Sequence, residues 1–445
     1  MKFIDTIKNI WKIEELKNRI LVTFGLLLVY RFGAQVVLPG VDAAELANLS
    51  TQTQDGLLGL LNAFTGGAFA NASVFALGIM PYISASIVVQ LMGIAIPYLQ
   101  KLQKEGESGR KKINQITRWL TIGITLIQAP GYIYNLFNIL PGSAFVIENQ
   151  TVFVASSVII LVTGCIFAMW LGEKITDKGI GNGISLLIMV GIIATLPQAF
   201  IQNFISRTSG DGGDIIMVLI ELVIWFVIIL ASVLLVMAVR QIPVQYARRT
   251  ADGGYEKNVF GSRQYIPLKL NASGVMPIIF AQAIMFVPGA VAGLSQSDAS
   301  QSVAAAFSDI FGLWYNLLFA LLIIVFTYFY TAITVPTNKM ADDLKRSGGF
   351  IPGIRPGSET AEYLDKIMSQ ITLPGSIFLA LIAVFPAIAV KVLNVQQGWA
   401  LFFGGTSLLI MVGVAIDTVQ QVNSYLLNRR YDGLMKTGKN RKAVA

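Results

Sequence analysis

The sequence has no histidine, a single cysteine and few charged residues. Without histidine, the chain lacks the side chain that most often binds metals or moves protons near neutral pH. With Cys165 as its one cysteine, it cannot form an internal disulfide. Charged residues make up 13% of the 445 positions, about half the share in ordinary soluble domains. These absences speak against a cytosolic globule and leave few groups for catalysis.

The sequence consists largely of long runs without charged residues. Hydrophobic residues make up 54% of the chain, and several runs are long enough to cross a hydrocarbon core of ~30 Å. The runs and the glycine, proline and charged residues between them predict an all-α membrane protein with ten transmembrane helices. The expected helices cover 20–38, 74–96, 119–137, 151–171, 183–204, 215–239, 273–292, 313–336, 373–390 and 398–416.

Lysine and arginine gather in alternate connections between these helices. The N-terminal tail, every second connection and the C-terminal tail hold nearly all of the 33 basic residues. Because basic residues are retained on the cytoplasmic side, both termini are expected in the cytoplasm. The first twenty residues lack the apolar core and small-residue cleavage site of a signal peptide, so we expect none.

Five expected helices precede the connection at 207–214 and five follow it. An odd number inverts the second half relative to the first. The chain is therefore expected to form one membrane domain with two halves, 1–207 and 208–445, related by a two-fold axis in the membrane plane. Channels and transporters both use such repeats, so the symmetry does not distinguish them.

Residues 56–100 contain no charged side chain, over 45 positions, which is roughly twice the length of one helical crossing. Within this stretch, residues 57–71 form a short apolar segment with Gly66 and Gly67 near its end. Such a segment predicts a re-entrant half-helix that is buried in protein or lines an aqueous cavity. An apolar external loop is the alternative.

Distinctive strings occur from the first expected helix to the last. They include the run from Gly56 to Gln90, Lys104-Glu-Gly-Glu-Ser-Gly-Arg-Lys-Lys112, Asp177-Lys-Gly-Ile-Gly-Asn-Gly-Ile-Ser185, Pro243-Val-Gln-Tyr-Ala-Arg248, Gly353-Ile-Arg-Pro-Gly357 and Gly404-Gly-Thr-Ser-Leu-Leu-Ile410. These strings closely resemble the SecY family, whose members form the central subunit of the protein-translocation channel.

The resemblance implies a passive hourglass channel for unfolded secretory polypeptides, closed by a plug and by a ring of aliphatic side chains. A narrow apolar ring sheds water and blocks ions, yet it can part around a crossing chain. A lateral gate between the second and third helices and the seventh and eighth would release signal sequences and transmembrane segments into lipid. On matching positions, the ring is Ile79, Ile83, Ile184, Ile188, Ile279 and Ile410, and the plug, about 57–71, includes Leu60, Phe64, Gly66, Gly67 and Asn71.

Two basic connections, at about 240–272 and 337–372, are long enough to form ordered structure. In the family they project into the cytosol and receive the ribosome or the SecA ATPase, and Arg248, Arg249 and Arg355 are the expected docking residues. Basic side chains suit the phosphates of ribosomal RNA. Membrane topology and lipid headgroup contacts would explain the same charges. The resemblance also implies SecE-like and SecG-like small subunits, signal peptides and nascent chains as clients, and a place in the plasma (inner) membrane.

A secondary transporter and an intramembrane enzyme are the rival classes. Transporters usually keep ionisable residues at mid-membrane, whereas Arg31 alone lies clearly inside an expected helix, with Glu221 and Asp417 near helix ends. Arg31 could snorkel, pair with a partner subunit or have a structural role. An enzyme would need a base beside its nucleophile, and the chain has no histidine for this role. The string 433–440 resembles a phosphate loop but ends in asparagine in place of the serine or threonine that such a loop requires, which speaks against a nucleotide site. We expect no catalytic residue, cofactor or metal here, so a separate ATPase must drive transport.

Overall fold

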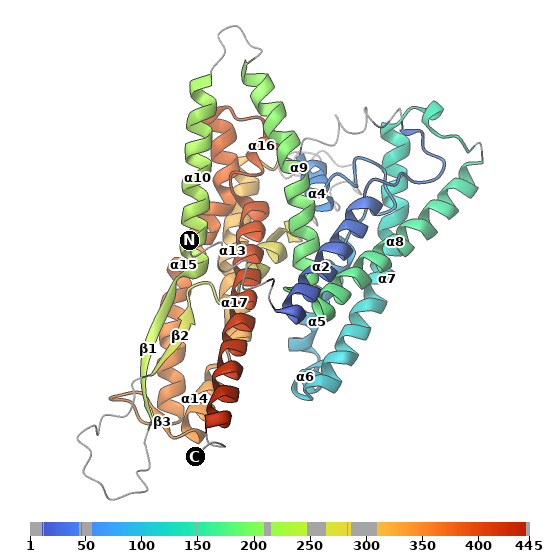
Figure 1. Cartoon of the computed structure of the whole chain (residues 1–445). Coiled ribbons are helices and arrows are strands. Elements are labelled where there is room, and N and C mark those ends of the chain that lie inside the picture. Colours follow the sequence, from blue (N-terminus) through green and yellow to red (C-terminus); the bar gives the residue numbers. More distant parts are fainter. Residues whose placement is uncertain are drawn as a thin grey trace, which may run out of the picture. The chain divides into compact units, whose positions relative to one another are not determined.

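The computed structural model describes residues 11, 13–43, 46, 56–147, 149–208, 215–246, 264–282, 284–285 and 309–441. Its long helices form two compact units (Figure 1). Unit 1 comprises Met1–Ile215, Val395–Phe402 and Ile410–Ala445, and unit 2 comprises Ile216–Asn394 and Phe403–Leu409. The chain enters unit 2 close to the connection at 207–214. The inverted symmetry of two halves, 1–207 and 208–445, stays a prediction.

Unit 1 is helical, and each of the five helices expected before residue 207 has a counterpart in it. Apolar side chains from α7 and α8 and from the segments around Leu38 and Phe69 form one buried cluster in this unit. Its elements are α2 (Glu14–Gly33), α4 (Gly56–Thr65), α5 (Met80–Ala95), α6 (Pro97–Lys104), α7 (Glu107–Ile139), η2 (Gly142–Ala144), α8 (Gln150–Lys178), α9 (Gly183–Thr208), α16 (Gln397–Ala400) and α17 (Gly405–Arg441) from residue 410 onward.

Unit 2 combines long helices with a small sheet. The expected helix at 273–292 is described as helical at 276–282 and 284–285, and its remaining C-terminal part lies outside the described residues. The other elements are α10 (Ile215–Met237), β1 (Val239–Tyr246), β2 (Gln264–Lys269), α13 (Leu313–Thr334), α14 (Thr337–Arg346), β3 (Gly349–Phe350) and α15 (Ser358–Leu393).

Six helices in the described part of the chain are long and apolar enough to cross a membrane, or seven if α5 and α6 count as one bent span. The bend of 102° falls just before Pro97, whose ring cannot continue the hydrogen bonding of α5. Large apolar side chains are exposed along α10, among them Ile216 and Leu234. Such a surface suits lipid rather than water.

Among the described residues, a small sheet departs from the expected all-α class. Strand β1 pairs antiparallel with β2 along its length and with β3 at its end, in the order β2-β1-β3. Side chains of β1, including Ile242 and Val244, join apolar residues of α14 and α15 in one buried cluster. The described parts of the two basic connections at 240–272 and 337–372 therefore form a single platform, defined here as β1, β2, β3, α14 and the first turns of α15.

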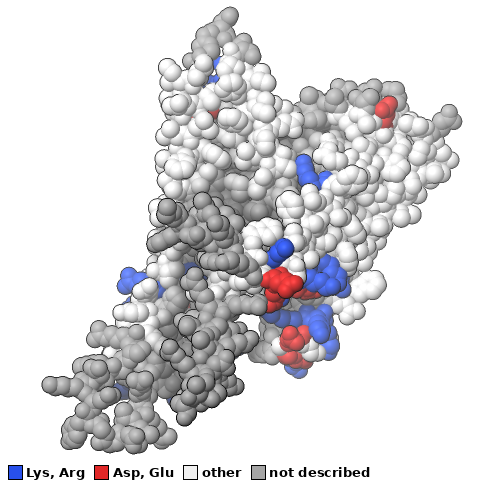
Figure 2. Space-filling model, in the orientation of Figure 1, with Lys and Arg blue, Asp and Glu red and all other residues white. Residues whose placement is uncertain are grey.

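Charged side chains are unevenly distributed over unit 1. Figure 2 shows them gathered around the start of α2 and the junction of α6 with α7, while most of the same face carries none. Glu14, Glu15, Lys17 and Arg19 lie at the start of α2, and Glu107 and Arg110 begin α7. A charged end beside a broad uncharged band is the pattern of a protein whose middle lies in lipid.

Candidate functional site

The short helix α4 is too short to cross a membrane. Its ten residues span about 15 Å at ~1.5 Å per residue, half the thickness of the hydrocarbon core. The chain then turns back through Gly66 and Gly67, with φ angles of +68° and +88°. Glycine adopts this left-handed conformation without steric cost. The N–H of Gly67 donates to the carbonyl of Asn62 at 2.9 Å and closes the helix end.

The end of α4 lies directly against α9. A Cβ atom added to Gly66 would lie 2.7 Å from the Cα of Gly191, and one added to Gly191 would lie 2.6 Å from the carbonyl oxygen of Phe64. The two backbones therefore touch only because both positions are glycine. Gly191 shares a helix face with Ile184 and Ile188, since residues four and seven apart lie on one side of a helix.

The same end of α4 also contacts the entry to α5. Thr65 is buried, and a Cβ added to Gly78 would lie 3.2 Å from its methyl carbon. Gly78 immediately precedes Ile79, the N-cap residue of α5, and the N–H of Ile83 donates to the carbonyl of Ile79 at 3.1 Å. The short helix thus touches both elements that carry the first four expected ring residues.

The six expected ring residues differ in their surroundings. Ile79, Ile188 and Ile410 are buried, whereas Ile83, Ile184 and Ile279 are half-buried. Ile79 and Ile83 lie at the start of α5, Ile184 and Ile188 lie in α9, and Ile410 lies in α17, all within unit 1. Ile279 lies in the helix at 276–282 of unit 2. A closed ring of all six residues stays a prediction.

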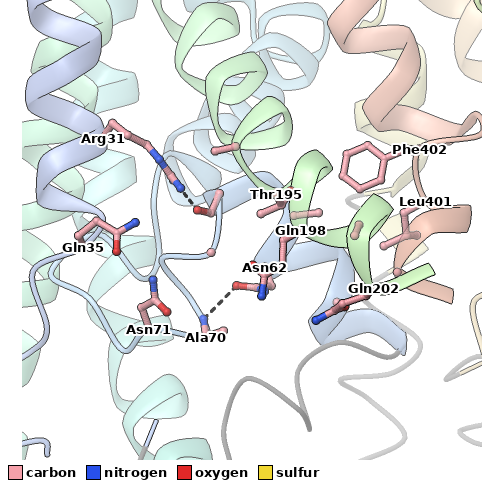
Figure 3. A pocket seen from close by; sticks show the side chains of 17 residues that line it. Arg31, Gln35, Asn62, Ala70, Asn71, Thr195, Gln198, Gln202, Leu401 and Phe402 are labelled. Atoms are coloured by element: carbon pink, nitrogen blue, oxygen red, sulfur yellow. Dashed lines mark hydrogen bonds between the residues drawn. The ribbon is translucent and has the colours of Figure 1, made fainter. Parts of the chain in front are cut away.

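A polar cavity of about 330 Å³ opens beside α4. Figure 3 shows amide side chains from several elements around it, together with the guanidinium of Arg31 reaching from α2. Arg31 donates a hydrogen bond to the carbonyl oxygen of Gly66. The lining residues in the described part of the chain include no carboxylate. The labelled amides are Gln35, Asn62, Asn71, Gln198 and Gln202.

The partner of Arg31 is the main feature that sequence analysis missed. The sequence showed Arg31 as a lone arginine inside an expected helix and Gly66–Gly67 as a glycine pair after an apolar segment. It gave no indication that the two contact each other. Asn62 was also missed. Its side-chain oxygen accepts from the N–H of Ala70 at 3.0 Å and ties α4 to the chain that follows the turn.

The return segment, residues 68–76, is held by different contacts. The hydroxyl of Tyr132 in α7 donates to the carbonyl of Phe69 at 2.8 Å, and the two rings pack edge to face with centroids 4.8 Å apart. The N–H of Leu38 donates to the carbonyl of Ala72 at 2.8 Å. This segment is therefore fixed to α7 and to the chain that follows α2.

The other expected site residues are only partly described. Phe64 is buried and Asn71 lines the cavity. The side chain of Leu60, and both Arg248 and Arg249, lie outside what the structure describes. Arg355 follows β3 on the platform, with its side chain 87% exposed and 3.7 Å from the carboxylate of Glu359. Its docking role stays a prediction.

Comparison with known proteins gives the family. The SecY family model matches residues 73–419. The chain is 41% identical to the protein translocase subunit SecY of Vibrio cholerae over 431 residues, which is 95% of each chain. It is also 41% identical to the same subunit of Halalkalibacterium halodurans over 440 residues, 97% of this chain and 99% of the relative. The chain belongs to the SecY family.

Solved channels share this fold. A SecY structure described as showing that its plug domain stabilises the closed state of the translocation channel matches with a TM-score of 0.59 and 18% identity, over 92% of each chain. Sec61 in the canine ribosome-channel complex matches with a TM-score of 0.54 and 16% identity, also over 92% of each chain. At these identities, the SecY-type likeness concerns the fold.

Proposed function

We propose that this chain is the central subunit of a Sec translocon, a passive gated channel for unfolded secretory polypeptides. Its relatives in the SecY family are named protein translocase subunits. The observation that carries the proposal is the contact between α4 and α9. There the half-helix ends against Gly191, on the same helix face as Ile184 and Ile188.

In the resting channel, α4 is the plug and the six isoleucines form the constriction. Apolar side chains at a narrow point exclude water and hydrated ions, and their rotamers can change around a crossing chain. The amides around the cavity supply neutral donors and acceptors. Such groups can exchange hydrogen bonds with the backbone of any polypeptide, so passage does not depend on the client's sequence.

The lateral gate is formed by the second and third transmembrane helices on one side and the seventh and eighth on the other. Its opening lets an apolar signal sequence or transmembrane segment leave sideways. The free energy of transferring apolar side chains from water to lipid drives this exit, so the channel itself needs no chemical step.

The proposed docking site for the ribosome and for a SecA motor is the platform with Arg355, together with the basic pair Arg248 and Arg249 in the connection that follows β1. An exposed guanidinium suits both RNA phosphates and protein carboxylates. SecE-like and SecG-like subunits complete the proposed complex. The distribution of lysine and arginine supports a membrane protein with both termini in the cytoplasm, and the proposed complex lies in the plasma (inner) membrane.

Crosslinking tests the proposed function. A photoreactive residue at Ile83 or Ile188 is expected to crosslink to a secretory chain stalled in mid-transport. Ile193 is the matched control because it lies on the same helix as Ile188 and its side chain is 44% exposed. Crosslinks at Ile193 without any at Ile83 or Ile188 would contradict a client path along this face of α9.

A further inference from the structure

We propose that Arg31 is a latch that holds a glycine hinge shut. The hinge is Gly66–Gly67, and the latch is the hydrogen bond from the Arg31 guanidinium to the Gly66 carbonyl. This inference rests on the proposed plug function of α4. It assigns to Arg31 a positioning role, because the residue acts on the pore through the segment that it holds.

The chain on the two sides of Gly66–Gly67 is held in different ways. Before the hinge, α4 contacts α9 through the glycine contact with Gly191. After it, the return segment is bonded to Tyr132 of α7. Gly67 also has free space around it, since a Cβ there would meet nothing closer than 3.9 Å. Backbone rotation at these two glycines can therefore move α4 while the return segment keeps its place.

The contacts that cross the hinge are mostly local. They include the bonds from Gly67 and Ala70 to Asn62 and from Phe69 to Thr65. These bonds join groups at most eight positions apart within one stretch of chain, and they have to open when the hinge rotates. The Arg31 bond differs because it spans 35 positions and comes from another helix. This bond ties the turn at Gly66–Gly67 to another helix, α2, whereas the local bonds only hold the turn together.

The electrostatic setting strengthens this bond. Arg31 lies in the last turn of α2, and the Gly66 carbonyl directly follows the last residue of α4. Helix C-termini carry partial negative charge, so the positive charge of Arg31 is favourable at the C-terminal ends of both α2 and α4. A charged donor also makes a stronger hydrogen bond than a neutral one.

A client can supply the chemical group that releases the latch. The carbonyls of a polypeptide that enters the amide-lined cavity are the same acceptors as the Gly66 carbonyl. Arg31 can therefore pass from the hinge to the client, which couples release of α4 to occupancy of the cavity. The resting seal then depends on Arg31, whereas the open channel does not.

The test compares two arginines of α2. Arg31→Met removes the latch, whereas Arg19→Met is the matched control. Arg19 also bonds to a glycine carbonyl, that of Gly179, but it contacts no residue of α4 or the hinge in the described structure. In planar bilayers, the full-length protein, in the complex in which it is isolated, should show resting ion conductance about tenfold higher with Arg31→Met and unchanged with Arg19→Met. Arg31→Lys, which keeps a cationic donor, should restore most of the seal.

A second readout follows α4 directly. Ala63→Cys places a thiol at a buried position of α4, and its modification by a membrane-impermeant maleimide should quicken about tenfold when Arg31→Met is added. If deletion of α4 raises conductance but Arg31→Met changes neither conductance nor modification, the latch is wrong and the plug stands. If deletion of α4 leaves conductance unchanged, the plug function fails and the latch fails with it. An equal leak from Arg31→Lys and Arg31→Met would also overturn the latch.

Discussion

The re-entrant helix α4 and the platform are both short insertions beside long helices, yet they are held differently. The platform has a two-strand ladder and a buried apolar cluster that includes Val244, Leu344 and Leu364. The end of α4 buries Phe64 and Thr65, but it approaches α9 through a glycine contact and is joined to α2 by the hydrogen bond from Arg31. Apolar burial stabilises through many side chains at once, at about 1.5–3 kcal/mol for each large one. A glycine contact buries no side chain of its own.

This difference matches what each region must do under the proposed function. A docking surface has to keep its shape under load, so a cooperative core is suitable. A plug has to leave its seat and return, so a few polar bonds and a smooth backbone contact are suitable. The variants below weaken the contacts of the platform or of the α4 region one at a time. They are given in order of decreasing expected effect on stability.

The largest effect is expected from the platform core. Leu364→Ala should destabilise the platform by ~2–5 kcal/mol because it leaves a cavity among buried apolar side chains. Limited proteolysis between β1 and β2 should become faster. Leu373→Ala lies on the same helix α15, where its side chain is 52% exposed, and should change little. Equal cleavage in both variants would mean that the platform does not depend on this cluster.

A smaller effect is expected from the seat of α4. Gly191→Ala adds a Cβ only 2.6 Å from the Phe64 carbonyl, so α4 must shift, at a cost of ~1–3 kcal/mol. Resting ion conductance in planar bilayers should rise. Gly123→Ala in α7, where an added Cβ meets nothing within 4 Å, should leave conductance unchanged. A tight seal in Gly191→Ala would show that α4 does not close the channel through this contact.

A still smaller effect is expected from the return segment. Tyr132→Phe removes the hydroxyl that donates to Phe69 and keeps the ring contact, so stability should fall by ~0.5–1.5 kcal/mol. Thermal unfolding of the purified protein measures the loss. Conductance should stay at its resting level because the hinge lies before this segment. A leak as large as that of Gly191→Ala would place the moving boundary beyond the hinge.

The long helices could be predicted because an uncharged apolar run of this length is typical of a membrane-spanning helix and rare in any other structure. Their ends could not. The expected helix at 119–137 begins at Glu107 in the structure, and the one at 373–390 begins at Ser358. Hydropathy marks where a helix leaves lipid, but backbone hydrogen bonding continues into water. The sheet was missed because Pro243 and Pro267 interrupt its strands, and proline argues against a strand interior.

The candidate site was likewise predictable from the sequence only in part. The glycine pair and the lone arginine were visible because each is unusual for its position. Their hydrogen bond joins residues 35 positions apart, so it depends on how α2 and α4 approach each other, which no local pattern encodes. Gly191 was missed for a related reason. A glycine in an apolar helix becomes informative only when the backbone that touches it is known.

The smallest effect on stability is expected at Arg355. Its pair with Glu359 is exposed and 3.7 Å long, and such pairs contribute about 0.3–0.5 kcal/mol. Arg355→Glu should therefore leave thermal unfolding almost unchanged while it slows motor-driven transport into vesicles, because the docking cation becomes an anion. Arg346→Glu makes the same charge change at another exposed platform site. Equal slowing by both would indicate general attraction to a basic surface, whereas slowing by Arg355→Glu alone supports a defined docking position.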